Sequence, residues 1–571
     1  MLRQKLCKDF KLHGLTLEPQ ASKYITSIFE RIDQSKHDKV IGRLINTLLG
    51  LNLESTKVTK EQCEEAVNSC KAERTDELRV VNLIDSYQTP KFCYDPEIKK
   101  FKLLSKDSEL NSANLFPNSA LPKSFLVHFR YQIIYQRLLR NQIFKSSGSF
   151  KLLSVEHLLA SGRDVDEVIV LGLLVQSKDY KWTLEDPTGV VPLDLTQSEF
   201  HQGLFPEGSI VLIEGSFFDG VLVVTGLGLP PTEASRETLN YFSIPDPLSG
   251  KLGQGQLDKF EALMTSSQAG VDSMVVFLGE TRLNQPDIVE KLNFLFSGFS
   301  SAPPLAFVLF GDFLTSETTY GVNAQNVSIL EKLLKQLLQA FVMNYPEKKA
   351  RPQLVLVPGP NDPIVSPSRI LPYASLRSDL ISADFQQDIA TNCADLQLDS
   401  KPDSKYRWLH LMSNPCRMRV FSRSVVLFRS QYNDKLINHC IHLPKMDVNQ
   451  TELDMSSLLG TSLAQCLASQ SHLSPLPIHI SPIYWPLDQA LHLHPLPDLV
   501  VCAEPNPLAN LNAASPVEGC VFMNPERFGQ LAPRSSNSEE IDSENQFKYE
   551  FSFKVWYPSS HTVEDSKLPE Y

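Results

Sequence analysis

Four apolar runs between residues 274 and 503 each end in a short polar motif of the kind that holds catalytic metal ions. Carboxylate and imidazole groups placed a few Å apart can bind two divalent cations, and a water that bridges the cations becomes a nucleophile. The chemistry to consider first is therefore metal-dependent hydrolysis. The motifs are Gly279-Glu280-Thr281-Arg282, Gly311-Asp312-Phe313-Leu314-Thr315, Pro358-Gly359-Pro360-Asn361-Asp362 and Ala503-Glu504-Pro505-Asn506.

The order of these motifs resembles the calcineurin-like metallophosphoesterases, whose motifs read Asp-x-His, Gly-Asp-x-x-Asp, Gly-Asn-His-Asp/Glu and Gly-His-x-His. Asp312 and Asp362 keep an aspartate at ligand positions. The resemblance implies that the fold is kept while the metal site, and with it any catalytic residue or cofactor, is lost. The substituted positions are Glu280 and Thr315, which replace aspartates, and Arg282, Asn361, Glu504 and Asn506, which replace histidines.

Two alternative assignments of these polar residues are possible. The surviving carboxylates beside Arg282 are equally well explained by an ion pair that fills the former metal cavity. His492 and His494 would face the same way on an extended strand and could ligate a metal together. No glycine precedes them to open the loop, and satisfied structural histidines are the favoured interpretation.

Further segments resemble the B-subunit family of replicative DNA polymerases, and within it the epsilon branch. This resemblance implies an OB-fold joined to an inactive phosphoesterase in a nuclear, non-catalytic accessory subunit. The implied partners are the C-terminal zinc-binding region of the catalytic subunit, small histone-fold subunits, and the replicative helicase through GINS. The matching segments are Trp182-Thr183-Leu184-Glu185-Asp186-Pro187-Thr188-Gly189, Val357-Pro358-Gly359-Pro360, Ser413-Asn414-Pro415-Cys416-Arg417 and Phe553-Lys554-Val555-Trp556-Tyr557-Pro558.

Two other functions compete with this one. The chain could be the B-subunit of polymerase delta or alpha, but its helical N-terminus and its acidic tail from Val563 to Lys567 argue against that branch. It could also be an active metal-dependent phosphodiesterase or 3′–5′ exonuclease, as in archaeal relatives. The loss of histidine from every motif argues against this second function.

Composition is compatible with an intracellular assembly subunit. The chain has 571 residues, which favours several domains, and no apolar stretch long enough to span a membrane. Its ten cysteines are isolated from one another, which favours a reducing compartment. Its net charge of −12 lacks the basic excess of an autonomous DNA-binding protein, so contact with DNA is expected to be weak or indirect.

The apolar patterns predict a multidomain α+β protein: an N-terminal helical bundle, an OB-fold β-barrel and a calcineurin-like phosphoesterase αββα sandwich. Family resemblance implies that the helical bundle is similar to the lid of AAA+ ATPases. The predicted boundaries are 1–85 for the helical domain, 86–150 for a connector, 151–235 for the OB-fold and 236–571 for the phosphoesterase-like domain. A capping box is expected at Thr59 and Gln62.

The connector is predicted to contain an amphipathic helix from Phe125 to Leu139. Arg130, Arg137 and Arg140 could contact nucleic acid, but a solvated or partner-facing surface is favoured on an acidic protein. Short β runs follow, with a tight turn at 186–189. The five expected OB-fold strands are Val168–Val175, Lys181–Leu184, Val190–Leu195, Ile210–Glu214 and Val221–Gly226.

The aromatic residues of the OB-fold are expected to pack rather than to stack with bases, because few lysines accompany Trp182, Phe217 and Phe218. In the last domain, residues 327–343 are predicted to form a helix. The polar runs 106–114, 375–405 and 534–546 are expected to be surface excursions. Near the C-terminus, a strand is predicted whose buried face carries Phe551, Phe553, Val555 and Tyr557, with Trp556 on the opposite face.

Overall fold

In the computed structural model, the chain divides into two units, Met1–Val80 and Val81–Tyr571. In the first unit the structure describes residues 6, 8–11, 15–29, 41, 44–45, 48, 57–60, 62–64, 67 and 79–80. In the second it describes 81–105, 114–144, 150–161, 163–315, 324–347, 351–362, 369–376, 408–431, 433–444, 451–505, 507–533 and 547–569. The predicted excursions 106–114, 375–405 and 534–546 lie almost wholly outside these residues.

The first unit is built around helix α2 (Pro19–Phe29), whose residues Ile25 and Phe29 are buried. Strand β1 (Thr16–Leu17) pairs in parallel with β2 (Lys57–Val58). The expected capping box is confirmed: Thr59 N donates to Gln62 Oε1 at 3.0 Å, and Gln62 N donates to Thr59 Oγ1 at 3.4 Å. These reciprocal bonds satisfy backbone N–H groups at a helix start.

The second unit begins with β3 (Val81–Asp85), which lies in the phosphoesterase-like domain. All five of its residues pair antiparallel with β17 (Cys416–Val420), and Val81 and Ile84 are buried. The helical domain predicted for 1–85 therefore ends at Val80 in the structure. The apolar spacing Val-x-x-Ile within this strand is compatible with a helix as well as with a strand. The spacing alone therefore could not show that the helical domain ends before Val81.

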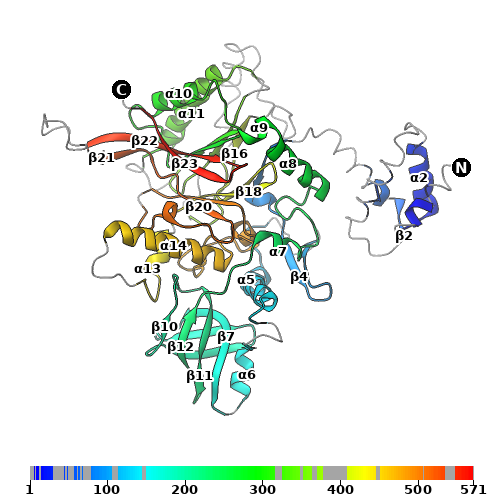
Figure 1. The fold of residues 1–571 in the computed structure, drawn as a ribbon, viewed down its shortest axis with the longest axis vertical. Coiled ribbons are helices and arrows are strands. Elements are labelled where there is room, and N and C mark those ends of the chain that lie inside the picture. The colour runs from blue at the N-terminus through cyan, green and yellow to red at the C-terminus, as the bar shows by residue number, and fades with distance from the viewer. Residues whose placement is uncertain are drawn as a thin grey trace. The chain divides into compact units, whose positions relative to one another are not determined.

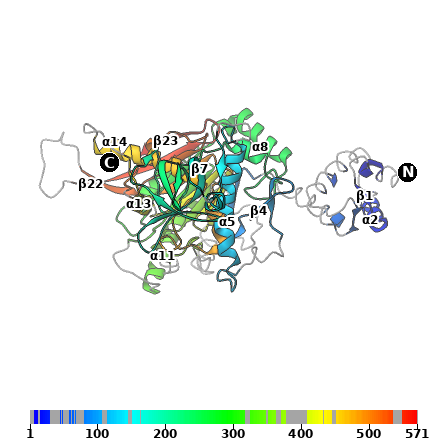
Figure 2. The same cartoon turned by 90° about the horizontal axis from the view of Figure 1, so that it is seen from below.

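The connector folds into a hairpin and a long helix. The hairpin pairs β4 (Phe92–Asp95) with β5 (Lys100–Leu103), and Phe92, Phe101 and Phe129 share a small core. Helix α5 (Leu121–Arg140) contains the predicted 125–139 segment and lies beside β7 of the barrel, as Figure 2 shows.

The arginines of α5 have neither of the two functions that the sequence suggested for them. Arg130 forms an ion pair with Asp488, Arg137 is buried and donates to Ser471 Oγ at 2.9 Å, and Arg140 Nε donates to Glu233 Oε1 at 2.8 Å. These ion pairs and hydrogen bonds hold α5 against the rest of the second unit. The interpretation of the three arginines as a solvated or partner-facing surface, or as a nucleic-acid contact, is therefore corrected.

The barrel has the OB-fold topology (Figure 1). Its strands run in the order β10-β12-β11-β7-β8-β9, and pairing of β12 with β9 closes the barrel. Phe217 belongs to the barrel core and Trp182 packs against it, as expected, whereas Phe218 is exposed. The strands are β6 (Leu152–Leu153), β7 (Val165–Gln176), β8 (Trp182–Asp186), β9 (Gly189–Asp194), β10 (Glu199–Phe200), β11 (Ile210–Phe218) and β12 (Val221–Gly228), with α6 (Val155–Ala160).

The side-chain amide of Gln470 joins the barrel to the phosphoesterase-like domain, because it bonds both backbone groups of Ile210 as a neighbouring strand would. Ile210 N donates to Gln470 Oε1 at 2.7 Å, and Gln470 Nε2 donates back to Ile210 O at 2.8 Å. Ser469 Oγ also donates to Pro230 O at 2.7 Å. All these groups are buried, so breaking either bond would leave unsatisfied polar groups in the interior.

The phosphoesterase-like domain contains two sheets. The first runs β16-β15-β14-β13-β22-β21 with β23 paired to β22, and the second runs β20-β19-β18-β17-β3. The strands are β13 (Val275–Leu278), β14 (Ala306–Phe310), β15 (Gln353–Val357), β16 (Leu409–Leu411), β18 (Arg423–Arg429), β19 (Leu499–Ala503), β20 (Val521–Met523), β21 (Phe528–Pro533), β22 (Phe547–Tyr557) and β23 (Thr562–Lys567).

Helices cover both sheets (Figure 1). Helices α10 and α11 pack on the first sheet, and α14 packs on the second. The predicted helix 327–343 lies within α11. With these layers the expected multidomain α+β architecture is confirmed. The helices are α7 (Ser235–Leu239), α8 (Gln254–Ser266), α9 (Gln268–Val271), α10 (Ile288–Gly298), α11 (Ala324–Asn344), α13 (Asn433–Asn438) and α14 (Glu452–Gln470), with the 3-10 helices η2 (Ser86–Gln88), η6 (Trp485–Leu491) and η7 (Leu511–Ala513).

The C-terminal strand β22 lies inside its sheet. Phe553 and Val555 are buried as predicted, and Phe551 and Tyr557 are half-buried. Trp556, predicted for the opposite and more polar face, is also fully buried, so that prediction is corrected. Strand β22 pairs with β23 over residues 552–557 and with β13 over 554–556, so it is an inner strand, and burial of Lys554 as well as Trp556 shows that its second face is also covered. No helix among the described residues has the length and hydropathy needed to cross a bilayer.

Candidate functional site

Three parallel strands of the first sheet bring the predicted polar motifs to one edge. Strands β13, β14 and β15 are in register, and their carboxyl ends lead into Glu280, Asp312 and Asn361 in turn. Glu280 and Asp312 are each only 2% exposed. The predicted polar motifs that follow these strands therefore lie at one edge of the sheet, and the fold buries the carboxylates of Glu280 and Asp312.

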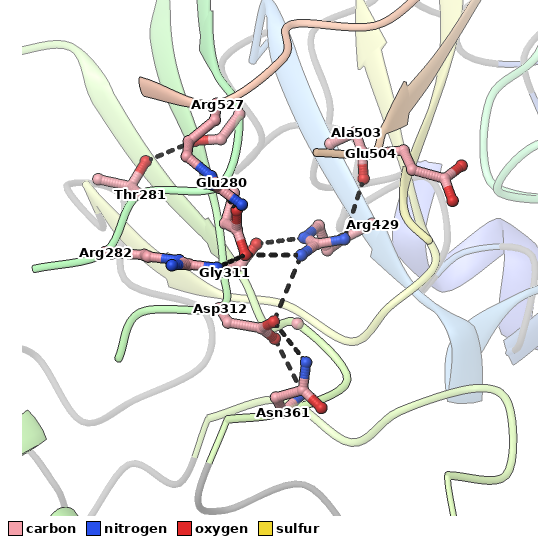
Figure 3. A network of polar contacts seen from close by, with 12 residues as sticks. Glu280, Thr281, Arg282, Gly311, Asp312, Asn361, Arg429, Ala503, Glu504 and Arg527 are labelled. Atoms are coloured by element: carbon pink, nitrogen blue, oxygen red, sulfur yellow. Dashed lines mark hydrogen bonds and ion pairs between the residues drawn. The ribbon is translucent and has the colours of Figure 1, made fainter. Parts of the chain in front are cut away.

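A guanidinium group stands between these carboxylates. Arg429, the last residue of β18 in the second sheet, is 0% exposed, and its Nη2 lies 3.3 Å from both Glu280 Oε1 and Asp312 Oδ2. Its Nε donates to Gly311 O, and its Nη1 donates to Ser430 O at 2.7 Å. Figure 3 shows the side chain reaching across from the second sheet to the two carboxylates.

Glu280 has two further cationic partners. Arg282 Nη2 lies 3.1 Å from Glu280 Oε1, and Arg527 Nε donates to Glu280 Oε2 (Figure 3). Three guanidinium groups thus surround two carboxylates, Glu280 and Asp312. A divalent cation would have to compete with them for the same oxygen atoms, and no imidazole stands at the predicted positions. The residues present do not fit the two-metal centre that the fold family implies.

The remaining residues of the third motif make structural contacts. Asn361 donates to Asp312 twice, from its backbone N at 2.8 Å and from Nδ2 at 2.7 Å. Asp362 accepts from Phe313 N at 2.7 Å and from Gly359 N at 2.8 Å. Burial, and next the nearby charge of Asp312, raise the pKa of Asp362 to about 8. Asp362 therefore braces the loops after β14 and β15.

The side chains of Thr315 and Glu504 form their hydrogen bonds with groups other than the three guanidiniums. Thr315 makes neutral hydrogen bonds: its N donates to Asn284 Oδ1 at 2.9 Å, and Asn284 Nδ2 donates to Thr315 Oγ1 at 2.6 Å. The Glu504 carboxylate points away from Arg429 in Figure 3 and accepts from Asn433 N at 3.3 Å. Burial, followed by the charge of Asp434, raises the pKa of Glu504 to about 7. Asn506 lies outside the described residues.

The contribution of Arg429 to this site was not predicted from the sequence motifs. Arg429 comes from β18, a strand that carries none of the family's four motifs, and it reaches the site from the opposite sheet. One signal was present: the apolar run from Val425 to Phe428 ends in an arginine, and a charged residue directly after a buried strand needs a partner. Arg527 gave no comparable signal, because it lies in a loop between two strands.

A second buried polar cluster involves one of the two histidines considered as metal ligands. His492 Nε2 lies 2.8 Å from Asp488 Oδ2, and His472 Nε2 lies 3.3 Å from Asp488 Oδ1. His472 Nδ1 accepts from Ser474 N at 3.0 Å, so its Nε2 carries the proton and donates to Asp488. Arg130 occupies the same carboxylate. The Asp488 carboxylate thus contacts two histidines and one arginine. A metal ion bound here would have to displace the proton on His472 Nε2 and the guanidinium of Arg130.

His494 does not join that cluster. Its ring packs against Phe101 and Phe242, with centroid distances of 4.9 and 5.4 Å. The segment is not the extended strand that the alternation suggested, because His492 caps the C-terminus of η6. Among the described residues the two histidines thus belong to different environments, His492 to the carboxylate cluster around Asp488 and His494 to an aromatic core.

The buried histidines predict a loss of stability in mild acid. Burial lowers the pKa of His472 to about 3 and lowers the pKa of His492 and His494 as well. The unfolded chain takes up protons near the ordinary value of about 6.5 while the folded chain stays neutral, so stability is full above this pH and falls as the pH falls. Each histidine contributes a slope of at most ~1.4 kcal/mol per pH unit.

Urea unfolding between pH 7.5 and 5 measures this slope directly. His472→Gln should reduce it, whereas a change at the exposed His157, such as His157→Gln, should leave it unchanged. An unfolding free energy that stays constant, or rises, from pH 7 to pH 5 would contradict the assignment of neutral buried imidazoles.

Comparison with known proteins matches most of the chain to DNA polymerase subunits. Residues 1–70 match the family "DNA polymerases epsilon N terminal", 120–231 match "DNA polymerase epsilon subunit 2-like, OB-fold domain", and 275–509 match the family of the B-subunits of DNA polymerases alpha and epsilon. The chain is 33% identical to human DNA polymerase epsilon subunit 2 and 32% identical to the mouse protein, in both cases over 99% of this chain and 98% of the relative. It is 30% identical to the Drosophila melanogaster protein of the same name over 100% of this chain and 98% of the relative.

An OB-fold barrel fixed to a two-sheet phosphoesterase-like domain, together with the family match over 275–509, places the chain in the class of B-subunits of DNA polymerases. Within that class the helical first unit and the full-length identities specify the branch. The chain belongs to the DNA polymerase epsilon subunit 2 family.

Proposed function

We propose that this chain is a non-catalytic scaffold in nuclear DNA replication. Its second unit holds the C-terminal zinc-binding region of the catalytic subunit of DNA polymerase epsilon, and its first unit links that polymerase to the replicative helicase through GINS. Small histone-fold subunits complete the assembly. The observation that carries the proposal is Arg429, whose guanidinium bridges Glu280 and Asp312 where catalysis would need metal ions.

The two rival functions have less support. An assignment to polymerase delta or alpha is disfavoured, because the relatives that cover nearly the whole chain are epsilon subunits. An active phosphodiesterase or exonuclease is disfavoured by the three guanidinium groups around Glu280 and Asp312. Direct binding of DNA is expected to be weak, because the net charge is −12 and few lysines accompany the barrel aromatics.

The scaffold proposal predicts that the purified chain does not hydrolyse phosphodiesters. A model substrate such as bis(p-nitrophenyl) phosphate should be turned over no faster by the chain than by buffer, with Mn²⁺ or Zn²⁺ present. The physical reason is that the oxygen atoms needed by the metals already pair with Arg429 and Asn361. Hydrolysis that Asp312→Ala abolishes, and that the surface change Asp565→Ala does not, would overturn the proposal.

The division into two units predicts that the two binding functions can be separated. Deleting residues 1–80 should leave the second unit folded and bound to the catalytic subunit, while binding to GINS is lost. Deleting 1–85 removes β3, which pairs with β17 along its whole length, and Asp85, which accepts from Ser413 N at 3.0 Å. The longer deletion should lower the melting temperature of the second unit.

Co-purification and thermal melting of these two deletions test this prediction. If the 1–80 deletion fails to retain the catalytic subunit although it melts like the full chain, the first unit contributes to that interface and the assignment of separate surfaces is wrong.

A further inference from the structure

A group of exposed and half-buried aromatic and aliphatic side chains lies where the connector meets η6. We call it the aromatic patch and define it as Tyr87, Phe116, Leu121, Tyr484 and Trp485. Phe116 is 68% exposed, Leu121 47% and Tyr87 46%. The rings of Phe116 and Tyr484 meet edge to face with centroids 5.5 Å apart. Both η2, which carries Tyr87, and α5, which begins at Leu121, pack against η6, so side chains from three separate segments form one apolar surface outside the core.

The backbone holds the patch residues in place. Tyr87 N donates to Asp85 Oδ1 at 3.0 Å, and the neighbouring Ser86 N donates to Ser413 Oγ at 2.8 Å. Tyr484 N donates to Leu371 O at 2.8 Å, and Leu487 N donates to Tyr484 O at 2.8 Å. A surface that is ordered before binding loses little conformational entropy when a partner docks, and this favours tight binding.

Two lysines border the patch. Lys123 Nζ lies 5.8 Å from the centre of the Trp485 ring. Lys91 lines a small hollow beside Trp485, together with Phe125 and Pro486. These lysines make a cationic rim at the Trp485 side of the patch, whereas the Asp85 carboxylate borders it beside Tyr87. The complementary surface would combine an apolar anchor with acidic residues.

These features fit a protein better than a single-stranded nucleic acid. Base stacking requires open ring faces along a groove whose cations follow the phosphate backbone. Here Lys123 lies over Trp485, Phe116 meets Tyr484 edge-on, and two lysines would neutralise few phosphates. Tryptophan, tyrosine and phenylalanine with a polar rim are the usual composition at the centre of protein interfaces.

We propose that the aromatic patch docks a segment of the catalytic subunit in which an aromatic or aliphatic side chain is flanked by Asp or Glu. This inference rests on the proposed scaffold function and assigns a surface to it. Tyr87 and Phe116 are the anchor contacts, and Lys123 pairs with an acidic residue of the partner.

Affinity measurements with the purified full-length chain and the purified catalytic subunit test the assignment. Combining Tyr87→Ala with Phe116→Ala should weaken binding at least about tenfold, because truncation of interface hot spots commonly has effects of this size. Lys123→Glu should also weaken binding, and its effect should shrink at high salt. Tyr180→Ala, at a barrel residue that is 82% exposed, is the matched control and should stay within about twofold of the unchanged chain.

The outcomes separate this inference from the proposed function. If the unchanged chain does not bind the catalytic subunit, the scaffold function itself fails. If the unchanged chain binds and the double variant binds equally well, with unchanged melting for both, only the aromatic patch assignment fails. If the double variant loses binding to a dT oligonucleotide but keeps the catalytic subunit, the patch binds nucleic acid and the inference is overturned.

A photo-crosslinking amino acid placed at Phe116 in the reconstituted complex tests the chemistry of the partner segment. The expected product is a crosslink to a catalytic-subunit peptide that carries an apolar residue beside Asp or Glu. Crosslinks that stay within this chain, or that reach only another subunit, would contradict the proposal.

Discussion

Replacing Arg429 with methionine is expected to destabilise the second unit by about 3–5 kcal/mol, because it leaves the buried carboxylate of Asp312 without its cationic partner. Arg429 is fully buried and bridges Glu280 and Asp312, while its other nitrogen atoms donate to the backbone of both sheets. A loss of this size is a large part of a typical stability of ~5–15 kcal/mol. Chemical unfolding followed by tryptophan fluorescence measures it.

The same strand supplies a matched control. Arg423, at the start of β18, pairs with Asp498 at 2.9 Å, but both side chains are more than a quarter exposed. Arg423→Met should therefore cost no more than about 1 kcal/mol. Adding Asp312→Asn to Arg429→Met should restore part of the loss, since the charge that lost its cation is then removed, whereas Glu280 keeps its pairs with Arg282 and Arg527. Equal destabilisation by Arg429→Met and Arg423→Met would show that the guanidinium does not organise the centre.

Truncating the chain after Gln546 is expected to unfold or aggregate the phosphoesterase-like domain and to abolish binding of the catalytic subunit. The truncation removes β22, which pairs with β13, β21 and β23. It also removes Phe553, Val555 and Trp556 from the interior. Burying one such large side chain contributes about 1.5–3 kcal/mol, so the three together rival the typical stability of a whole domain, ~5–15 kcal/mol.

Truncating after Pro558 should have a smaller effect. It removes β23, a mostly exposed edge strand, and with it the ion pair between Lys554 and Asp565. Strand β22 would keep its pairing with β13 and its buried side chains. Thermal melting of both truncations beside the full chain is the measurement. Equal melting temperatures for all three chains would show that β22 is not part of the core.

The sequence allowed prediction of those features of the site that depend on the local order of apolar and polar residues. Apolar runs followed by Glu280, Asp312 and Asn361 are adjacent parallel strands with their polar ends together, because parallel strands in register bring their carboxyl ends to one edge. The cation that fills the centre was assigned to Arg282, which is near in sequence. The structure instead places Arg429 between the two carboxylates and Arg282 on Glu280 alone.

The other differences arise in the same way, from contacts between distant segments. Arg130 and Arg140 look like surface residues until their partners, Asp488 and Glu233, are known, and those lie 358 and 93 residues away. Trp556 was placed on an open face because alternation alone does not show whether the more polar face of a strand is also covered. Periodicity reports which residues of one element share a face, and it does not report what covers that face.

Metal analysis of the purified chain tests the central claim most directly. The full-length chain, without the catalytic subunit, would be incubated with excess Mn²⁺ or Zn²⁺ and desalted. Its metal content would then be measured by inductively coupled plasma mass spectrometry. Because Arg429 and Asn361 already satisfy the carboxylate of Asp312, we expect far less than one bound ion per chain, and no change on Asp312→Ala. Two ions per chain that disappear in the Asp312→Ala variant would contradict the account.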